Sequence, residues 1–348
     1  MRNYVFLIIS LLLTVYSASA QKNVYFDKLQ NIDDVYYYNG KPFTGLSLVR
    51  HDSTKKKMIQ IQWKDGLMDG QKITWYKDEV LKQTMNFSMG KRHGEYVNYY
   101  HNGKVKERGN YLNDTINGWN FGYYESGQIK FSFYYDKGVQ SDTNTMFFEN
   151  GQMEQQVVLK NSRIQGAFRS WYPDGKMMKE IYYKNGVLDG SNKEWYADGT
   201  LSNVGNYKDG LKDGKFETYE ILINTPLKIE NYKSGKKEGV WMVFGLEGDT
   251  TLIAHYNNDT LHGEYVQLME GRVENKGNYI HGVKDGFWQQ NLVTLVGGSE
   301  GTYKMGVKVG DWKLYDFKGK WLATITFDDK GEIVDEYWYG MKKRKGKK

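Results

Sequence analysis

The sequence predicts an all-β protein, an elongated array of about twelve stacked antiparallel β-hairpins. Three observations predict this fold. A glycine recurs about every 24 residues along most of the chain, a second turn signal such as Asn-Gly follows many of these glycines by nine residues, and strand-forming residues alternate between the turns. Because one such hairpin cannot bury its apolar surface alone, successive copies must pack side by side.

The N-terminus resembles a secretory signal peptide. Arg2 precedes an apolar run from Val5 to Val15, and the small residues Ala18-Ser19-Ala20 follow. This order is typical of export signals, and the run is shorter than the ~20 apolar residues of a membrane span. We therefore expect cleavage after Ala20 and a periplasmic, cell-surface or extracellular location. The expected organisation is a signal peptide at 1–20, a lead-in at 21–35, the hairpin array at 36–340 and a basic tail at 341–348.

The recurring glycine defines the repeat unit. In the stretch GKRHGEYVNYYHNGK, Gly94 is the reference position, and Gly90 is a further turn residue four positions earlier. Equivalent positions begin at Gly45 and recur at steps of 23 to 25 residues, with Asp142 filling the single gap. We call this position the marker and count other positions from it. The predicted structural turn glycines are Gly70, Gly94, Gly118, Gly166, Gly190, Gly214, Gly239, Gly263, Gly286 and Gly310.

Aromatic residues also recur in register. Position +17 is nearly always aromatic, and positions +5 and +6 form an aromatic pair in many copies. Neighbouring strand residues point to opposite faces, so each pair is expected to place one ring on each face of the sheet. Such ladders either form the core of a thin stack or leave one row partly open as a binding platform. The candidate binding row at +5 is Trp75, Tyr99, Tyr123, Phe147, Trp171 and Trp195.

At this point the sequence resembles a known family. Units such as GVLDGSNKEWYADGT and GVKVGDWKLYDFKGK are similar to MORN repeats, and more closely to the bacterial variant found in exported and antitoxin-module proteins. The resemblance covers residues 36–339 and implies stacked antiparallel hairpins with a scaffold role. It also suggests, as one alternative, an antitoxin-like neutralisation of a partner protein. The longer unit and the tyrosine pair differ from the eukaryotic pattern.

No catalytic or metal-binding motif is evident. The chain has no cysteine, which removes disulfides and thiolate sites, and its six histidines include three that directly precede a turn glycine. Glycine turns that recur about a dozen times and lead into strands do not indicate a phosphate loop, which needs one such turn before a helix. We therefore expect a protein that is not an enzyme, with no cofactor and no metal site.

The partner classes follow from charge and aromatic content. Loss of Arg2 with the signal leaves 47 basic and 42 acidic residues, a mild balance of +5 that gives no argument for nucleic acid. We expect a protein partner along the β surface. The alternative is an envelope glycan or an anionic lipid, bound through the aromatic row and the tail, which holds six basic residues between Lys342 and Lys348. The loop His51–Lys57 interrupts the repeat pattern, as a specific contact site or a tolerated insertion does.

Overall fold

The computed structural model describes residues 22–221, 225–291 and 297–340. The predicted signal peptide and basic tail lie outside these residues. Within them, the only helical segment is the short 3-10 turn η1 (Phe26–Lys28), and nearly all other regular structure is β-strand. The chain divides into two compact units, Met1–Val139 (unit 1) and Gln140–Lys348 (unit 2), which are described separately. The strand content and the pairing of successive strands confirm the predicted all-β fold of antiparallel hairpins.

Unit 1 joins an N-terminal cap to the first repeats. From β5 to β10 each strand pairs antiparallel with the next in chain order. Strand β10 then pairs antiparallel with both the short β11 and β12, and β12 pairs antiparallel with β13. The strands are β1 (Asn23–Tyr25), β2 (Gln30–Ile32), β3 (Val35–Tyr38), β4 (Lys41–Pro42), β5 (Gly45–Arg50), β6 (Lys57–Lys64), β7 (Leu67–Trp75), β8 (Leu81–Ser88), β9 (Lys91–Tyr99), β10 (Val105–Leu112), β11 (Thr115–Ile116), β12 (Gly118–Tyr123) and β13 (Ile129–Asp136).

The cap comprises residues 22–44, which include the lead-in expected from the sequence. Strand β1 pairs parallel to β5, and β2, β3 and β4 form a small antiparallel sheet. Phe43 and Trp63 are buried at their junction, and Tyr36 packs on Trp63 with ring centroids 4.5 Å apart. The Trp63 indole donates to the buried Ser47 hydroxyl at 2.7 Å, so the polar atoms of this core are paired.

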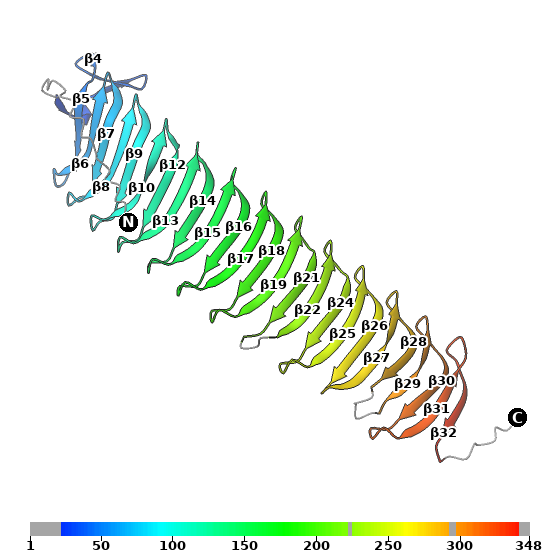
Figure 1. Ribbon diagram of the computed structural model, residues 1–348. Helices are drawn as coiled ribbons and strands as arrows, with labels where there is room; N and C mark the ends of the chain where they lie inside the picture. Colours follow the sequence, from blue (N-terminus) through cyan, green and yellow to red (C-terminus); the bar gives the residue numbers. More distant parts are fainter. Residues whose placement is uncertain (1–21, 222–224, 292–296, 341–348) are drawn as a thin grey trace, which may run out of the picture. The chain divides into compact units, whose positions relative to one another are not determined.

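Unit 2 continues the same construction, with each strand antiparallel to its neighbour in the chain. Figure 1 shows these strands following one another in chain order, from green to red. They are β14 (Val139–Phe147), β15 (Met153–Lys160), β16 (Arg163–Trp171), β17 (Met177–Lys184), β18 (Val187–Trp195), β19 (Leu201–Lys208), β20 (Leu211–Lys212), β21 (Gly214–Tyr219), β22 (Pro226–Lys233), β23 (Lys236–Lys237), β24 (Gly239–Phe244), β25 (Thr250–Asn257), β26 (Thr260–Met269), β27 (Arg272–Ile280), β28 (Val283–Gln290), β29 (Ser299–Lys304), β30 (Val307–Tyr315), β31 (Trp321–Phe327) and β32 (Ile333–Trp338).

Two kinds of turn close the hairpins. At one end, two residues with positive φ connect the strands, as at Met89 (48°) and Gly90 (82°). This is the type I′ geometry, whose twist matches that of the flanking strands. At the other end, Asn102-Gly103 closes a longer turn in which the Gly103 amide donates to the Tyr100 carbonyl at 3.0 Å. Both turn positions agree with the sequence pattern.

The marker glycines lie inside or at the start of strands, not in the turns themselves. Gly94 has φ of 89° and lies in β9 between Arg92, which pairs with Phe87, and Tyr96, which pairs with Met85. Between these two pairs, strand β9 advances by four residues while β8 advances by two, and the extra residues of β9 form a β-bulge. Asp142 takes φ of 60° at the equivalent position. The marker is thus the residue that makes the bulge possible, because few side chains tolerate this φ.

Side chains of the preceding strand satisfy the backbone at several bulges. The Asn86 side-chain amide donates to the Glu95 carbonyl at 2.8 Å, and the Gln71 backbone N–H donates to the Gln62 side-chain oxygen at 2.5 Å.

The bulge also fixes which residues share a face. We define face A by position +2 of each repeat, together with −2, +15 and +17, and face B by positions +1, +3 and +5.

Candidate functional site

The predicted +5 row lies on face B, as three residues in unit 1 and three in unit 2. Trp171 is buried at 9% exposure, and the other five residues are partly buried. Their backbone carbonyls also join consecutive repeats, because the +6 tyrosine of one repeat donates to the +5 carbonyl of the next. The pairs are Tyr76 to Tyr99 at 3.1 Å, Tyr100 to Tyr123 at 2.7 Å, and Tyr172 to Trp195 at 2.8 Å.

A partly exposed aromatic group of unit 1 includes one member of that row. On face B, Trp119 is 41% exposed and packs against Phe121 at 6.1 Å and against Tyr134 at 5.4 Å between ring centroids. The Arg108 guanidinium lies 5.3 Å from the Phe121 ring and 6.0 Å from the Tyr123 ring. We call these five residues the Trp119 cluster. Sequence reasoning found only Tyr123, because Trp119 and Phe121 do not recur at positions +1 and +3 of other repeats.

The strand order explains why these side chains meet. Arg108 lies on β10, Trp119, Phe121 and Tyr123 alternate along β12, and Tyr134 lies on β13. The pairs Arg108–Phe121 and Trp119–Tyr134 are directly opposite in the two ladders. Paired residues of antiparallel strands share a face, so the five side chains form one continuous surface. Trp, Tyr and Arg are the side chains that most often dominate protein interfaces.

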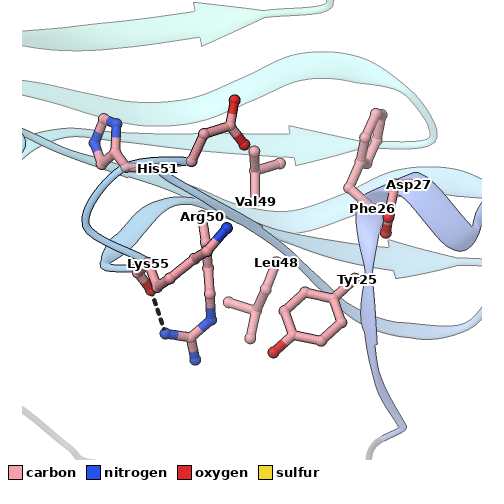
Figure 2. A pocket seen from close by; sticks show the side chains of 9 residues that line it. Tyr25, Phe26, Asp27, Leu48, Val49, Arg50, His51 and Lys55 are labelled. Atoms are coloured by element: carbon pink, nitrogen blue, oxygen red, sulfur yellow. Dashed lines mark hydrogen bonds between the residues drawn. The ribbon is translucent and has the colours of Figure 1, made fainter.

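A cavity of about 380 Å³ lies where the cap meets the first hairpin. Figure 2 shows it, with Tyr25 beside Leu48 and with the Arg50 guanidinium donating to the Lys55 carbonyl at 2.7 Å. His51, in the loop that interrupts the repeat pattern, also lines it, and its buried Nε2 atom has no hydrogen-bond partner among the described residues. The cavity mixes apolar side chains with charged ones such as Asp27 and Asp52.

The histidines do not gather into a site. His262 and His281 lie in adjacent repeats with ring centroids 5.2 Å apart. Within residues 22–221, 225–291 and 297–340, no group of three or more His, Asp or Glu residues is placed to hold a metal ion. The same residues contain no helix long and apolar enough to cross a membrane.

The fold and its bulged hairpins define an all-β repeat protein. Three of its repeats, residues 92–113, 164–185 and 188–209, match the family model described as a MORN repeat variant. These matches place the repeats in the MORN repeat family, as their sequence motifs predicted. Repeats of this family often serve as scaffolds that bind proteins or membranes.

Two solved structures show weak similarity. The Photorhabdus luminescens Tc holotoxin pore is 10% identical, with a TM-score of 0.18 over 89% of this chain and 19% of that chain. A crystal structure of TcdB2-TccC3 is 9% identical, with a TM-score of 0.13 over 84% and 18%. The chain thus spans less than a fifth of the length of either, and neither likeness supports a function. No curated protein matches the sequence.

Proposed function

We propose that this protein is an exported, non-enzymatic scaffold that binds a protein partner through face B of its hairpin sheet. The Trp119 cluster carries the proposal. It presents a tryptophan that is 41% exposed, with Phe121 stacked on it and the edge of Tyr134 against it, while Arg108 lies over the Phe121 ring. A partly exposed ring that is already held in place by its neighbours loses little entropy when a partner covers it.

A protein partner fits this surface better than a small molecule does. Small-molecule sites are concave and surround most of their ligand, whereas the Trp119 cluster lies on the face of a sheet. Rigid aromatic residues beside an arginine supply the large contact area and the directional hydrogen bonds of protein interfaces. The surrounding strands hold these side chains in register, so the surface exists before the partner arrives.

Site-specific photocrosslinking in the envelope of the source cell tests the interface. A benzophenone amino acid replaces Asn110, an exposed residue two positions from Arg108 on β10, and a second probe replaces Asn102 in a turn as a control. We expect the Asn110 probe to capture one defined polypeptide. This adduct should disappear in Trp119→Ala and remain in Phe317→Ala, whose ring is 63% exposed in a turn of unit 2. An adduct that survives Trp119→Ala, or no adduct at all, would contradict the proposal.

Export has its own test. The intact mass and N-terminal sequence of the protein from its source cell should show a chain that begins at Gln21 and is recovered outside the cytoplasm. A mature chain that retains Arg2, or one confined to the cytoplasmic fraction, would overturn the export component and leave the interface test unaffected.

A further inference from the structure

A row of lysines covers the aromatic rings of face A in unit 2. Each lysine occupies position −2 and pairs in the ladder with a tyrosine of the preceding repeat that lies at position +16, +17 or +18. Each ammonium lies over the +2 ring of its own repeat, at 4.1 to 4.7 Å from the ring centroid. The members of this lysine row are Lys212, Lys237, Lys284 and Lys308. Leu261 replaces the lysine in the one intervening repeat.

The positive charges of this row have no carboxylate partner among the described residues. None of the four lysines forms an ion pair with a carboxylate of the described residues, although other lysines of unit 2 do, such as Lys215 with Glu217. Burial lowers the pKa of Lys308, and burial together with the neighbouring Lys308 lowers the pKa of Lys284. Half-buried cations without a counter-ion are costly, so a bound anion stabilises them more than it stabilises fully hydrated lysines.

A second feature lies at the Lys212 end of the row. A cavity of about 170 Å³ is lined by Tyr207, Phe216, Lys212 and several polar side chains, among them Asn192 and three glutamates, Glu194, Glu217 and Glu230, each of which is ion-paired with a lysine outside the row. The buried Asn192 Oδ1 atom has no hydrogen-bond partner among the described residues. An unpaired buried acceptor beside aromatic rings calls for a hydroxyl donor on an apolar frame, which is the chemistry of a sugar ring.

We propose that the lysine row and the cavity together bind a linear anionic polysaccharide, separately from the protein interface on face B. One sugar occupies the cavity and donates a hydroxyl to Asn192, while acid groups further along the polymer meet the lysines. Lys212 and Lys237 stand two strands apart, roughly 10 Å at the usual strand spacing, and so do Lys284 and Lys308, whereas Lys237 and Lys284 stand twice as far apart because Leu261 intervenes. A site that repeats at a fixed interval suits a polymer whose charges also repeat. Three glutamates line the cavity, so the acid groups should bind most strongly at Lys284 and Lys308.

Titration of the full mature chain with defined polymers tests this proposal. Sodium polygalacturonate and dextran sulfate are the anionic probes, and neutral dextran is the uncharged control, with binding followed by calorimetry. We expect both anionic polysaccharides to bind and dextran not to bind, with affinity that falls as salt rises. Polyglutamate and phosphatidylserine vesicles are the competing classes. Equal or tighter binding of either would overturn the assignment to polysaccharide.

Variants locate the site. Lys284→Gln with Lys308→Gln should weaken polygalacturonate binding about thirtyfold, because two charges are lost. Lys208→Gln with Lys233→Gln changes the net charge equally at two exposed lysines on face B, and should leave the affinity within about twofold. Lys284→Arg with Lys308→Arg keeps the charge and should retain binding, which controls for folding. Equal losses in both Gln pairs would contradict the proposal, as would an unchanged affinity in the first pair.

The cavity and the interface need separate readouts. Asn192→Ala should weaken binding of polygalacturonate and affect binding of dextran sulfate less. The reason is that the cavity accepts a hydrogen bond from a sugar hydroxyl, whereas the lysine row attracts the acid groups. The same affinity for polygalacturonate in Asn192→Ala would remove the cavity from the site. None of these variants should change the photocrosslink at position 110, so failure here is distinguishable from failure of the protein interface.

Discussion

Position +2 is filled differently in unit 1 and at the end of unit 2. In unit 1 it holds Tyr96 and Asn120, both 4% exposed, and the Tyr96 hydroxyl lies 2.8 Å from Glu107 and 3.0 Å from Asn120. In unit 2 it holds Trp288 and Trp312, both 1% exposed and packed among tyrosines. One backbone position therefore supports a hydrogen-bonded network in one region and a stack of rings in the other.

The residue at position +2 is related to the face of the sheet on which exposed aromatic rings are found. Where the polar Asn120 fills position +2 of face A, the same repeat carries exposed rings on face B in the Trp119 cluster, in addition to Phe133 and Tyr135 on face A. Where tryptophan fills position +2, as at Trp288 and Trp312, the rings become the core of face A and lysines cover them. The same residue type is thus exposed at Trp119 on face B and buried at Trp288 and Trp312 on face A, while Trp171 on face B is also buried.

Neighbouring strands compensate in size within unit 2. Gly277 faces Trp288 and Gly301 faces Trp312, and a Cβ atom at either glycine would lie 2.1 Å or 2.4 Å from the indole. Where position +2 is the smaller Asn192, the facing residue is the larger Ile181. In these three pairs a large residue on one strand faces a smaller one on the next, as close packing favours.

Removal of a face A tryptophan should have the largest effect on stability. Trp288→Ala deletes a ring that is 1% exposed, and we expect it to lower the free energy of unfolding by about 3–5 kcal/mol. Phe287→Ala changes the neighbouring residue, whose ring is 57% exposed on face B, and should cost less than about 1 kcal/mol. Urea denaturation followed by circular dichroism measures both. Similar costs for the two variants would erase the distinction between the faces.

Adding volume opposite a tryptophan should come next. Gly301→Ala places a methyl group against Trp312, and we expect a cost of about 1–3 kcal/mol from overpacking. The same change in a Trp312→Leu background should cost less, because the smaller side chain makes room. A double-mutant cycle on urea midpoints measures this coupling. Independent, additive costs would show that size compensation does not govern the ladder.

The polar network of unit 1 should respond to pH. Burial first, and then the hydrogen bond to Glu107, raise the pKa of Tyr96 above its ordinary value of 10.0. The folded state therefore keeps this proton at a pH where the unfolded state loses it, so the contribution of Tyr96 is complete below pH 10 and declines above it. We expect Tyr96→Phe to cost about 1–2 kcal/mol at neutral pH and less above pH 10. A difference that grows with pH would have the wrong sign.

The hydroxyls that join repeats should have the smallest effect. Tyr172→Phe removes the 2.8 Å hydrogen bond to the Trp195 carbonyl and leaves the ring in place. We expect a loss of about 0.5–1 kcal/mol in the free energy of unfolding. Hydrogen exchange of β16 to β19 should show the local change. An unchanged exchange pattern would mean that water replaces the hydroxyl without cost.

The sequence predicted what repeats and missed what varies. The turn at Met89-Gly90, the turn at Asn102-Gly103 and the left-handed role of Asp142 follow from spacing, because these positions carry the same backbone demand in each copy. The bulge at Gly94 could not be distinguished from a turn, since both select glycine. The bulge changes which face of the sheet each side chain points to between the turn and position +2. Therefore the burial of Trp288 could not be read from the pattern, and neither could the exposure of Trp119.

Long-range contacts account for the other omissions. The cap core around Phe43 and Trp63 joins residues from the lead-in and from the first hairpin, which no periodic pattern brings together. The lysine row depends on cross-strand pairs such as Lys308 with Tyr303 and on the ring of Trp312 beneath. Its sequence signal was the recurring lysine two residues before the marker glycine, visible in GVKVG and GLKDG.

One paired measurement tests the central claim, that rings on face B bind a partner while rings on face A hold the fold. The photocrosslinked adduct at position 110 and the urea midpoint are measured on the same preparations of Trp119→Ala and Trp288→Ala. We predict that Trp119→Ala loses the adduct and keeps a urea midpoint near that of the wild type. Trp288→Ala should unfold at a lower urea concentration than the wild type. A Trp119→Ala protein that unfolds as easily as Trp288→Ala, yet still forms the adduct when folded, would contradict the claim.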